Sequence, residues 1–265
     1  MEWLEWLGFA SAVIVGLVLG LIGGGGSILT VPVLVYFMEI PPALATAYSL
    51  FVVGLSSGFG AWRHFQSGLI DVKTGTIFAG PSLLAVYATR RWLVPSIPKT
   101  FHVLGLGLTK DLFIMVLFAI LMIAASLSMI KGRKTTSENG GRAKWWLVPF
   151  EGIAVGVLTG IVGAGGGFLI IPALVVLVKM PMKTAIGTSL MIIAAKSLIG
   201  FIGDLGSGQD IEWGLLSVFT ALTVFGIILG LKWSKTLDGE SLKKGFGWFV
   251  LIMGAVILLK ELLAH

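Results

Sequence analysis

The sequence predicts an all-α polytopic membrane protein, and three observations support this fold class. Hydrophobic residues make up 56% of the 265-residue chain and charged residues only 12%, whereas soluble domains contain about 25% charged residues. Long apolar stretches recur along the whole chain, and the two halves of the chain are related in sequence. The chain has no cysteine, which excludes disulfides, thiolate metal sites and cysteine nucleophiles.

Eight hydrophobic stretches alternate with polar segments. Six of them fit one crossing of a bilayer core, which takes about 20 helical residues. The fourth contains the adjacent charges Lys110 and Asp111, so its spanning part is expected over 111–130. The first and fifth are too long for one simple crossing. The stretches are 7–38, 43–62, 75–92, 101–130, 147–178, 184–203, 213–231 and 245–264.

A polar segment over 131–144 divides the chain into two membrane regions. It is rich in lysine, arginine, glycine and hydroxyl residues, and this composition predicts a solvated linker. Residues 1–130 are expected to form a first transmembrane repeat, and residues 145–265 a second.

The two regions are predicted to be copies of one unit. A shift of 140 residues aligns Gly16–Gly68 with Gly156–Gly208, and 17 of the 53 aligned pairs are identical without a gap. Because glycines and prolines coincide, the sequence predicts two homologous four-segment repeats. Such internal duplication is typical of transporter folds.

Each repeat opens with a glycine cluster inside an apolar stretch. One glycine in a helix interior costs up to about 1 kcal/mol, so a cluster followed by proline predicts a broken helix or a re-entrant hairpin. Unwound backbone is unstable in lipid and is expected to line a cavity. The alternative is a packing face of small residues. The glycines predicted to lie at the site are Gly23, Gly24, Gly25, Gly26, Gly163, Gly165, Gly166 and Gly167.

The distribution of lysine and arginine distinguishes two topologies. If all eight stretches cross the membrane, 8 such residues lie on one side and 9 on the other. If the first and fifth are re-entrant hairpins, the division becomes 13 against 4, which the positive-inside rule favours. This arrangement places the linker in the cytoplasm, both termini outside, and the two repeats in inverted topology. In this topology, the adjacent Arg90 and Arg91 lie on the outer side and are an exception to the positive-inside rule.

The broken helices predict an anion site. Helix N-termini attract negative charge, and the second limbs are expected to begin near Ser27 and Gly167. Hydroxyl residues near the first tip and early in the matching second and sixth stretches are further candidates, although such hydroxyls often bond their own backbone. These candidates are Ser27, Thr30, Ser49, Thr188 and Ser189.

Lys196 lies inside the sixth stretch. A lysine at a bilayer centre costs roughly 2.5–3.5 kcal/mol unless it is paired or faces water. We interpret it as an anion ligand or a counter-ion in a gated salt bridge; the alternative is an ammonium that snorkels to the interface. His64 and Asp204 end the matching second and sixth stretches, where solvated interfacial positions are expected.

No enzymatic constellation is present in the sequence. The three histidines, His64, His102 and His265, lack metal-ligand spacing, and there is no nucleotide-binding loop. We therefore expect no enzyme activity and no cofactor. The net charge of +6 is assigned to loops that set topology rather than to nucleic-acid binding.

The chain resembles the sulfite exporter TauE/SafE family of membrane permeases. The resemblance rests on the duplication and on the signature Gly-x-x-Gly-x-Gly-Gly-x-x-Leu-x-x-Pro at 20–32 and 160–172. It implies export of sulfur-containing or organic anions such as sulfite and sulfonates, coupled to a proton or ion gradient, across a bacterial-type inner membrane. An anion channel and a non-transporting membrane subunit or assembly factor are the alternatives. The segment 93–110 is longer than the usual connection.

Overall fold

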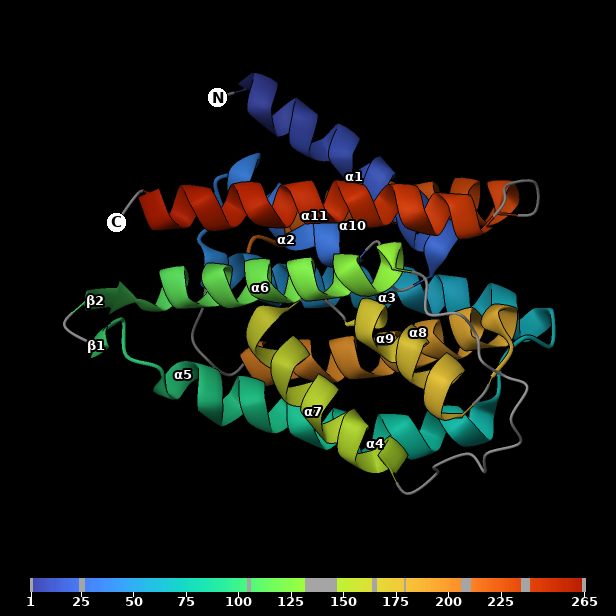
Figure 1. The fold of residues 1–265 in the computed structure, drawn as a ribbon. Helices are drawn as coiled ribbons and strands as arrows, with labels where there is room; N and C mark the ends of the chain where they lie inside the picture. Colours follow the sequence, from blue (N-terminus) through green and yellow to red (C-terminus); the bar gives the residue numbers. More distant parts are fainter. Residues whose placement is uncertain are drawn as a thin grey trace.

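The computed structural model describes residues 2–23, 27–103, 106–131, 147–163, 166–178, 180–205, 211–234 and 239–263. The described chain is helical apart from one short hairpin (Figure 1). The predicted linker lies outside the described residues, except for Lys131. The helices are α1 (Glu2–Ile22), α2 (Ser27–Tyr36), α3 (Pro42–Gln66), α4 (Val72–Ala88), a π-helical segment η2 (Thr89–Leu93), α5 (Val94–Ser96), α6 (Lys110–Ile130), α7 (Leu147–Val162), α8 (Gly167–Leu177), α9 (Met182–Leu205), α10 (Trp213–Trp233) and α11 (Gly239–Leu263).

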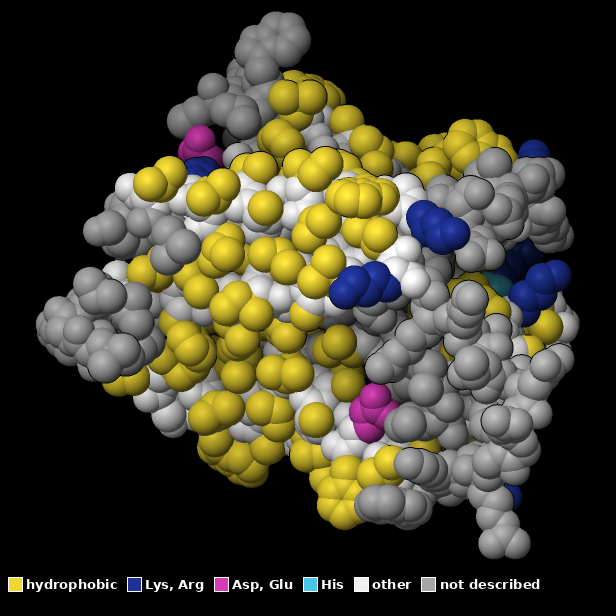
Figure 2. All heavy atoms as spheres, viewed as in Figure 1, with side chains coloured by type: hydrophobic (Ala, Val, Ile, Leu, Met, Phe, Trp, Pro, Cys, Tyr) yellow, Lys and Arg dark blue, Asp and Glu magenta, His cyan; other side chains and the backbone are white. Residues whose placement is uncertain are grey.

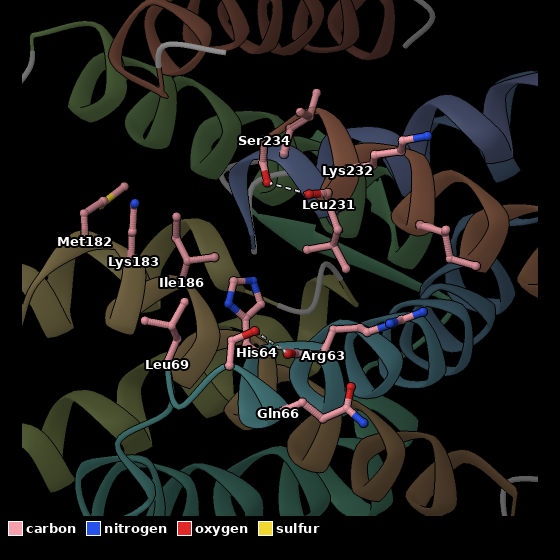
Figure 3. A pocket seen from close by; sticks show the side chains of 14 residues that line it. Arg63, His64, Gln66, Leu69, Met182, Lys183, Ile186, Leu231, Lys232 and Ser234 are labelled. Carbon is pink, nitrogen blue, oxygen red and sulfur yellow. Dashed lines mark hydrogen bonds between the residues drawn. The ribbon is translucent and has the colours of Figure 1, made fainter. Parts of the chain in front are cut away.

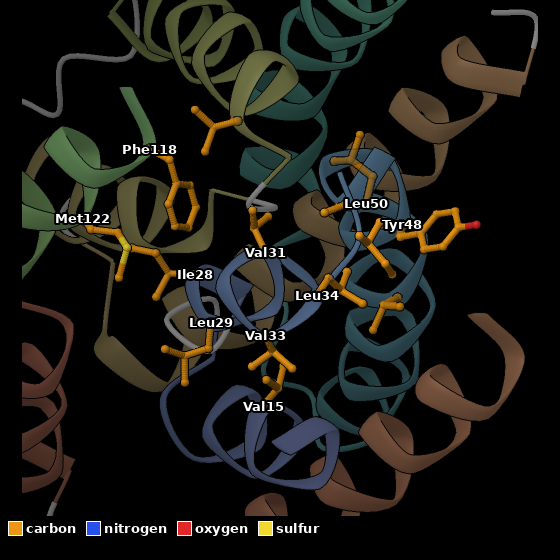
Figure 4. Close-up of a cluster of buried hydrophobic side chains, with 14 of the residues drawn as sticks. Val15, Ile28, Leu29, Val31, Val33, Leu34, Tyr48, Leu50, Phe118 and Met122 are labelled. Carbon is orange, nitrogen blue, oxygen red and sulfur yellow. The ribbon is translucent and has the colours of Figure 1, made fainter. Parts of the chain in front are cut away.

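The two overlong apolar stretches each form a pair of helices. The first divides into α1 and α2, and the second into α7 and α8. The predicted interruption at the glycine clusters is therefore present in both halves. The short helix α2 lies inside the bundle, with Ile28, Val31 and Leu34 packed among side chains of neighbouring helices (Figure 4). Burial on all sides keeps the ends of this broken helix away from lipid.

Helices α3 and α9 form an antiparallel pair at the centre of the bundle. Gly54 of α3 lies against Leu198, and Gly60, further along α3, lies against Leu190. Around this pair, α1 packs against α10, α4 against α7, and α6 against α11. Each of these three outer contacts joins a helix of the first half to one of the second half.

Small residues allow the closest of these contacts. Gly16 and Gly20 of α1 face Gly226 and Gly230 of α10, and a Cβ on any of the four would overlap the facing backbone. This spacing of small residues four apart is a common way for membrane helices to approach each other. In the second half, Gly156 of α7 lies in the same way against the backbone of Ser82 in α4. Glycines outside the clusters therefore provide close helix packing in both halves.

Two short strands, β1 (Thr100–Val103) and β2 (Leu106–Thr109), pair in antiparallel orientation, with Thr100 opposite Thr109. The sequence did not predict these strands. Pro95 lies in the first turn of α5, where proline is tolerated, and Pro98 follows the end of α5 at Ser96, where proline prevents the helix from continuing. The hairpin projects from one end of the bundle, opposite the end where α3 leads into α4 (Figure 1).

The outer surface of the bundle is apolar. Many large hydrophobic side chains are exposed, including Leu84 at 75% and Trp6 at 71%. Figure 2 shows such side chains over the middle of the face formed by α6 and α11, with most of the visible lysine and arginine toward one end. Among the described residues, four helices are long and apolar enough to span a membrane: α3, α6, α9 and α10. An apolar surface of this extent is the lipid-facing surface of a multi-pass membrane protein.

Candidate anion site at the helix breaks

The first limb of each broken helix ends at a glycine in a left-handed conformation. Gly23 follows α1 with a φ of 78°, and Gly163 follows α7 with a φ of 73°. The N–H of Gly163 donates to the carbonyl of Thr159 at 2.8 Å, which closes the last turn of α7. A Cβ on Gly163 would also overlap the backbone of Thr46 in α3. Both the conformation and the space therefore require glycine at this break.

The second limb in this half begins at a third left-handed glycine. Gly166 has a φ of 69° and stands at the N-cap of α8. Its carbonyl accepts hydrogen bonds from the N–H groups of Leu169 and Ile170, at 3.0 and 3.1 Å. The first amides of α8 precede these donors in the chain, and a helix N-terminus carries about half a positive charge. Helix α8 thus begins inside the bundle at the predicted position, Gly167.

Lys196 brings a side-chain cation to the same place. Its side chain is fully buried, and its Nζ donates to the Oγ1 of Thr159 at 2.9 Å. Thr159 in turn donates to the carbonyl of Val155 in α7 at 2.7 Å. A Cβ on Gly166 would lie only 2.7 Å from the ammonium nitrogen. The ammonium and the N-terminus of α8 are therefore neighbours, and within the described chain no carboxylate forms an ion pair with Lys196.

Thr159 was not predicted from the sequence as a site residue. It precedes the glycine cluster by one helical turn, and hydroxyls in apolar helices commonly bond only to the backbone. Its second role, as acceptor for Lys196, depends on the packing of α7 against α9. No sequence signal marks that contact.

The predicted hydroxyl residues fall into two groups. Thr30 and Ser49 are fully buried, and their hydroxyl groups have no hydrogen-bond partner in the described structure. Thr188 and Ser189 are also buried, but Thr188 accepts from the N–H of Asp71 at 3.0 Å, and Ser189 donates to the carbonyl of Ile186 at 2.8 Å. Thr188 therefore links α9 to the start of α4, and Ser189 bonds its own helix.

The first break is described less fully. Ser27 is buried at the first position of α2, as predicted. Ser56, which the 140-residue shift equates with Lys196, is buried in α3 with a hydroxyl group that has no partner. Gly23 lies against Ile186 of α9 and Ile171 of α8. Four predicted site residues lie outside the described residues: Gly24, Gly25, Gly26 and Gly165.

A pocket of about 730 Å³ opens beside the first break. It lies between the ends of α1, α3 and α10 and the beginning of α9. Figure 3 shows Arg63, Lys183 and Lys232 arranged around His64 in its wall. Its lining residues include no aspartate or glutamate. We call this pocket the basic vestibule; its wall includes Ile186, the residue that packs on Gly23.

Arg90 and Asp204 form a buried ion pair on the other side of the bundle. The Nη1 of Arg90 lies 3.3 Å from the Oδ2 of Asp204, and their side chains are 1% and 6% exposed. The same Nη1 donates to the hydroxyl of Thr46 at 3.1 Å. The Nε and Nη2 groups of Arg90 are buried without a hydrogen-bond partner. Each buried donor left unsatisfied costs about 1–3 kcal/mol.

The ion pair corrects two sequence-based expectations. Arg90 was assigned to the outer side of the membrane at the end of the third stretch, but its side chain in η2 is buried in the bundle. Asp204 was expected to be solvated at an interface, but the end of α9 is covered by η2. The charge of Arg90 is paired with Asp204 inside the protein and need not count in the positive-inside comparison, whereas Arg91 is exposed.

Comparison with known proteins assigns the chain to a family. The sequence profile described as sulfite exporter TauE/SafE matches residues 8–257. A probable membrane transporter protein of Xylella fastidiosa (strain Temecula1) is 27% identical, over 92% of this chain and 91% of its own. The probable membrane transporter protein YunE of Bacillus subtilis is 28% identical over 96% of each chain. A probable membrane transporter protein of Methanocaldococcus jannaschii is 29% identical, over 93% of this chain and 94% of its own.

No solved structure matches the chain significantly. The family profile covers both broken helices, the vestibule residues and Lys196. The chain therefore belongs to the sulfite exporter TauE/SafE family.

Proposed function

We propose that this protein is a secondary transporter that exports a small sulfur-containing or organic anion, such as sulfite or a sulfonate, across the bacterial inner membrane. The observation that carries the proposal is the position of Lys196 beside the N-terminus of α8. The ammonium and the helix dipole both raise the electrostatic potential at one buried point. The positive ammonium and the positive end of the helix dipole repel each other where no carboxylate is paired with Lys196. An anion bound between them would be attracted to both.

The basic vestibule supports the anion assignment. Arg63, Lys183 and Lys232 surround its opening, and clefts of one charge sign concentrate ions of the opposite sign. All three residues belong to the side that the positive-inside rule assigns to the cytoplasm. The vestibule would therefore admit a cytoplasmic anion, in agreement with export.

The arrangement of the helices supports inverted repeats. Helices α2 and α3 begin at Ser27 and Pro42, and α8 and α9 begin 140 residues later, at Gly167 and Met182. The contact of α1 with α10 corresponds, after exchange of the halves, to that of α7 with α4. The break at Gly23 packs on Ile186, and the break at Gly163 packs on its equivalent, Thr46. Two such halves can rock against each other around a central site, which is the basis of alternating access.

Flux through the purified protein in liposomes tests this function. Radiolabelled sulfite, methanesulfonate, sulfate and acetate would be compared, with and without a pH gradient, against liposomes that contain the Lys196→Met variant. We expect saturable flux that prefers one sulfur anion and is accelerated by unlabelled substrate on the opposite side. Stimulation by the pH gradient would identify proton coupling.

The alternatives give different results. Flux that rises linearly with concentration and shows no counterflow would indicate an anion channel. Absence of flux for every anion, with folded protein and a co-purified partner, would indicate a non-transporting membrane subunit.

A further inference from the structure

The guanidinium of Arg90 is held on one side only. Its Nη1 is occupied by Asp204 and by the hydroxyl of Thr46. Its Nε–H and Nη2–H groups lie next to each other on the opposite edge and have no protein partner. The side chain is 1% exposed, so bulk water does not satisfy these donors. A buried arginine that served only as the partner of Asp204 would not need to keep this edge free.

Two parallel N–H donors on one guanidinium edge match a particular acceptor. They can donate together to two oxygens of one carboxylate, phosphate or similar oxyanion, in a bidentate arrangement. Sulfite and sulfonates present the same pair of oxygens on one central atom. A halide ion has no second acceptor atom and cannot use this geometry.

The second helix break connects Arg90 with Lys196. At one end of this break, Gly163 packs on Thr46, the residue that accepts from Arg90. At the other end, Gly166 lies beside the ammonium of Lys196. Of the two glycines that flank this break, Gly166 therefore lies beside a buried cation, and Gly163 is linked to the other through Thr46.

The order of charged residues along α9 gives their distance from the basic vestibule. Lys183 lines the basic vestibule, Lys196 lies more than three turns further along, and Asp204 follows two turns later. At 1.5 Å per residue, Asp204 lies about 12 Å beyond Lys196 along the helix axis. Residues at positions i, i+4 and i+8 share one helix face, so Lys196 and Asp204 lie on similar sides of α9. Arg90 is thus the cation further from the vestibule.

We propose that Arg90 forms a second oxyanion-binding site, in which two oxygens of the transported anion accept from its Nε–H and Nη2–H. Asp204 and Thr46 hold Nη1 and orient the guanidinium. The inference rests on the proposed function and adds to it a substrate class: anions with two oxygens on one centre. The ammonium of Lys196 is a single point charge and attracts any anion, whereas the guanidinium edge of Arg90 has two parallel donors. We therefore expect Arg90, rather than Lys196, to select oxyanions over halides.

Binding to the purified full-length protein tests the proposal without requiring transport. Sodium sulfite, sodium methanesulfonate and sodium bromide would be titrated in detergent at constant ionic strength, with dissociation constants obtained from thermal shifts. Arg90→Lys keeps the positive charge beside Asp204 but removes the two-donor edge. Arg91→Lys is the matched control, because Arg91 is the next residue and its side chain is exposed.

We expect Arg90→Lys to weaken sulfite and methanesulfonate binding by about tenfold, equivalent to about 1.4 kcal/mol, and to change bromide binding less than about twofold. Arg91→Lys should leave all three unchanged. The decisive measurement is the change in the ratio of sulfite affinity to bromide affinity. Loss of a purely structural ion pair would weaken the binding of both anions equally. If Arg90→Lys does not fold, the double variant Arg90→Gln, Asp204→Asn, which removes both charges together, replaces it.

An equal loss for sulfite and bromide, or no loss for either, would overturn the Arg90 site. If Lys196→Met abolishes sulfite binding while Arg90→Lys leaves it intact, the proposed function stands and this inference fails. If no oxyanion binds the wild-type protein, the proposed function fails, and the inference fails with it.

Discussion

Lys196 combines a charged side chain with complete burial in a helix long enough to cross a membrane. One hydrogen bond to Thr159 satisfies only one of its three donors. The other donors lie near the N-terminus of α8, where a carboxylate or another anion is the favourable partner. At the scale of single residues, therefore, the position of this ammonium is the main support for the proposed anionic substrate.

Replacement of Lys196 by methionine should weaken anion binding by about 10- to 100-fold. A hydrogen bond to a charged group contributes about 1.5–3 kcal/mol, and 1.4 kcal/mol corresponds to tenfold in affinity. Methionine retains most of the side-chain volume, so the protein should fold. Titration of sulfite into the purified variant measures the change, with Lys99→Met, at an exposed position, as control. Wild-type affinity in Lys196→Met would remove Lys196 from the site.

The sequence identified the charged residue but not its partners. Lys196 stood out because lysine is rare in apolar stretches. Thr159 and Arg90 did not, because a threonine in a helix is common and an arginine next to Arg91 reads as part of a loop. Their roles depend on which helices pack together, and no local pattern in the sequence contains that information.

The broken helices are the elements that form the candidate anion site. In α7 and α8, the break requires Gly163 and Gly166 in left-handed conformations, which cost other residues about 1–2 kcal/mol each. The same break brings a helix N-terminus into the bundle at the depth of Lys196. A continuous helix through this region would bury its amides in hydrogen bonds and leave no anion-binding end.

Gly163→Ala should lower the melting temperature more than Gly68→Ala does. Both glycines have positive φ, 73° and 67°, so the conformational penalty is similar. A Cβ on Gly163 would overlap Thr46, whereas a Cβ on Gly68 has no heavy atom within 4 Å. Thermal unfolding of the two variants in detergent separates the cost of the overlap with Thr46 from the cost of a positive φ at alanine. Equal melting temperatures would show that α7 can move away from α3 without cost.

Helix α4 depends on a capping interaction that responds to pH. Asp71 is its N-cap, and its carboxylate accepts from the N–H and the hydroxyl of Thr74 at 3.1 and 2.6 Å. The hydroxyl of Thr74 is the main cause that lowers the pKa of Asp71 below its ordinary value of 3.8. A lowered pKa means that the carboxylate stabilises the fold above about pH 4 and that this contribution disappears as the pH falls through the folded-state pKa.

Asp71→Ala should therefore destabilise the protein by about 1 kcal/mol near neutral pH, the usual cost of losing an N-cap. The difference in melting temperature between wild type and Asp71→Ala should narrow below about pH 4. Thermal unfolding of both proteins over a pH series measures it. A difference that stays constant down to pH 3 would show that the carboxylate charge does not contribute.

At the scale of the whole molecule, helices of the first half of the chain pack against helices of the second half. Helices α3 and α9 pack against each other at the centre, and α6 packs against α11. The basic vestibule opens toward one end of this arrangement, and the Arg90–Asp204 pair lies toward the other end of α9. The pocket and the buried ion pair thus lie toward opposite ends of α9.

A single cysteine in place of Glu138 should react with a membrane-impermeant maleimide only from the cytoplasm. The chain has no native cysteine, so the label reports one position. Lys99→Cys is the matched control and should react only from the outside, because the inverted arrangement places these two residues on opposite sides. Labelling of intact cells and of inverted vesicles measures both variants. Reaction of Glu138→Cys in intact cells would contradict the hairpin topology.

The sequence by itself determined the class of the protein, the positions of the helices and the interruption of two of them. Composition, apolar stretch length and glycine clusters are local properties, and the physics of backbone hydrogen bonding in lipid allows few structures for them. The tertiary structure alone decided that Lys196 meets the start of α8, that Thr46 meets Gly163, and that Arg90 meets Asp204. These contacts join residues distant in sequence, and they depend on which helix faces fit together, a property of the whole packed bundle.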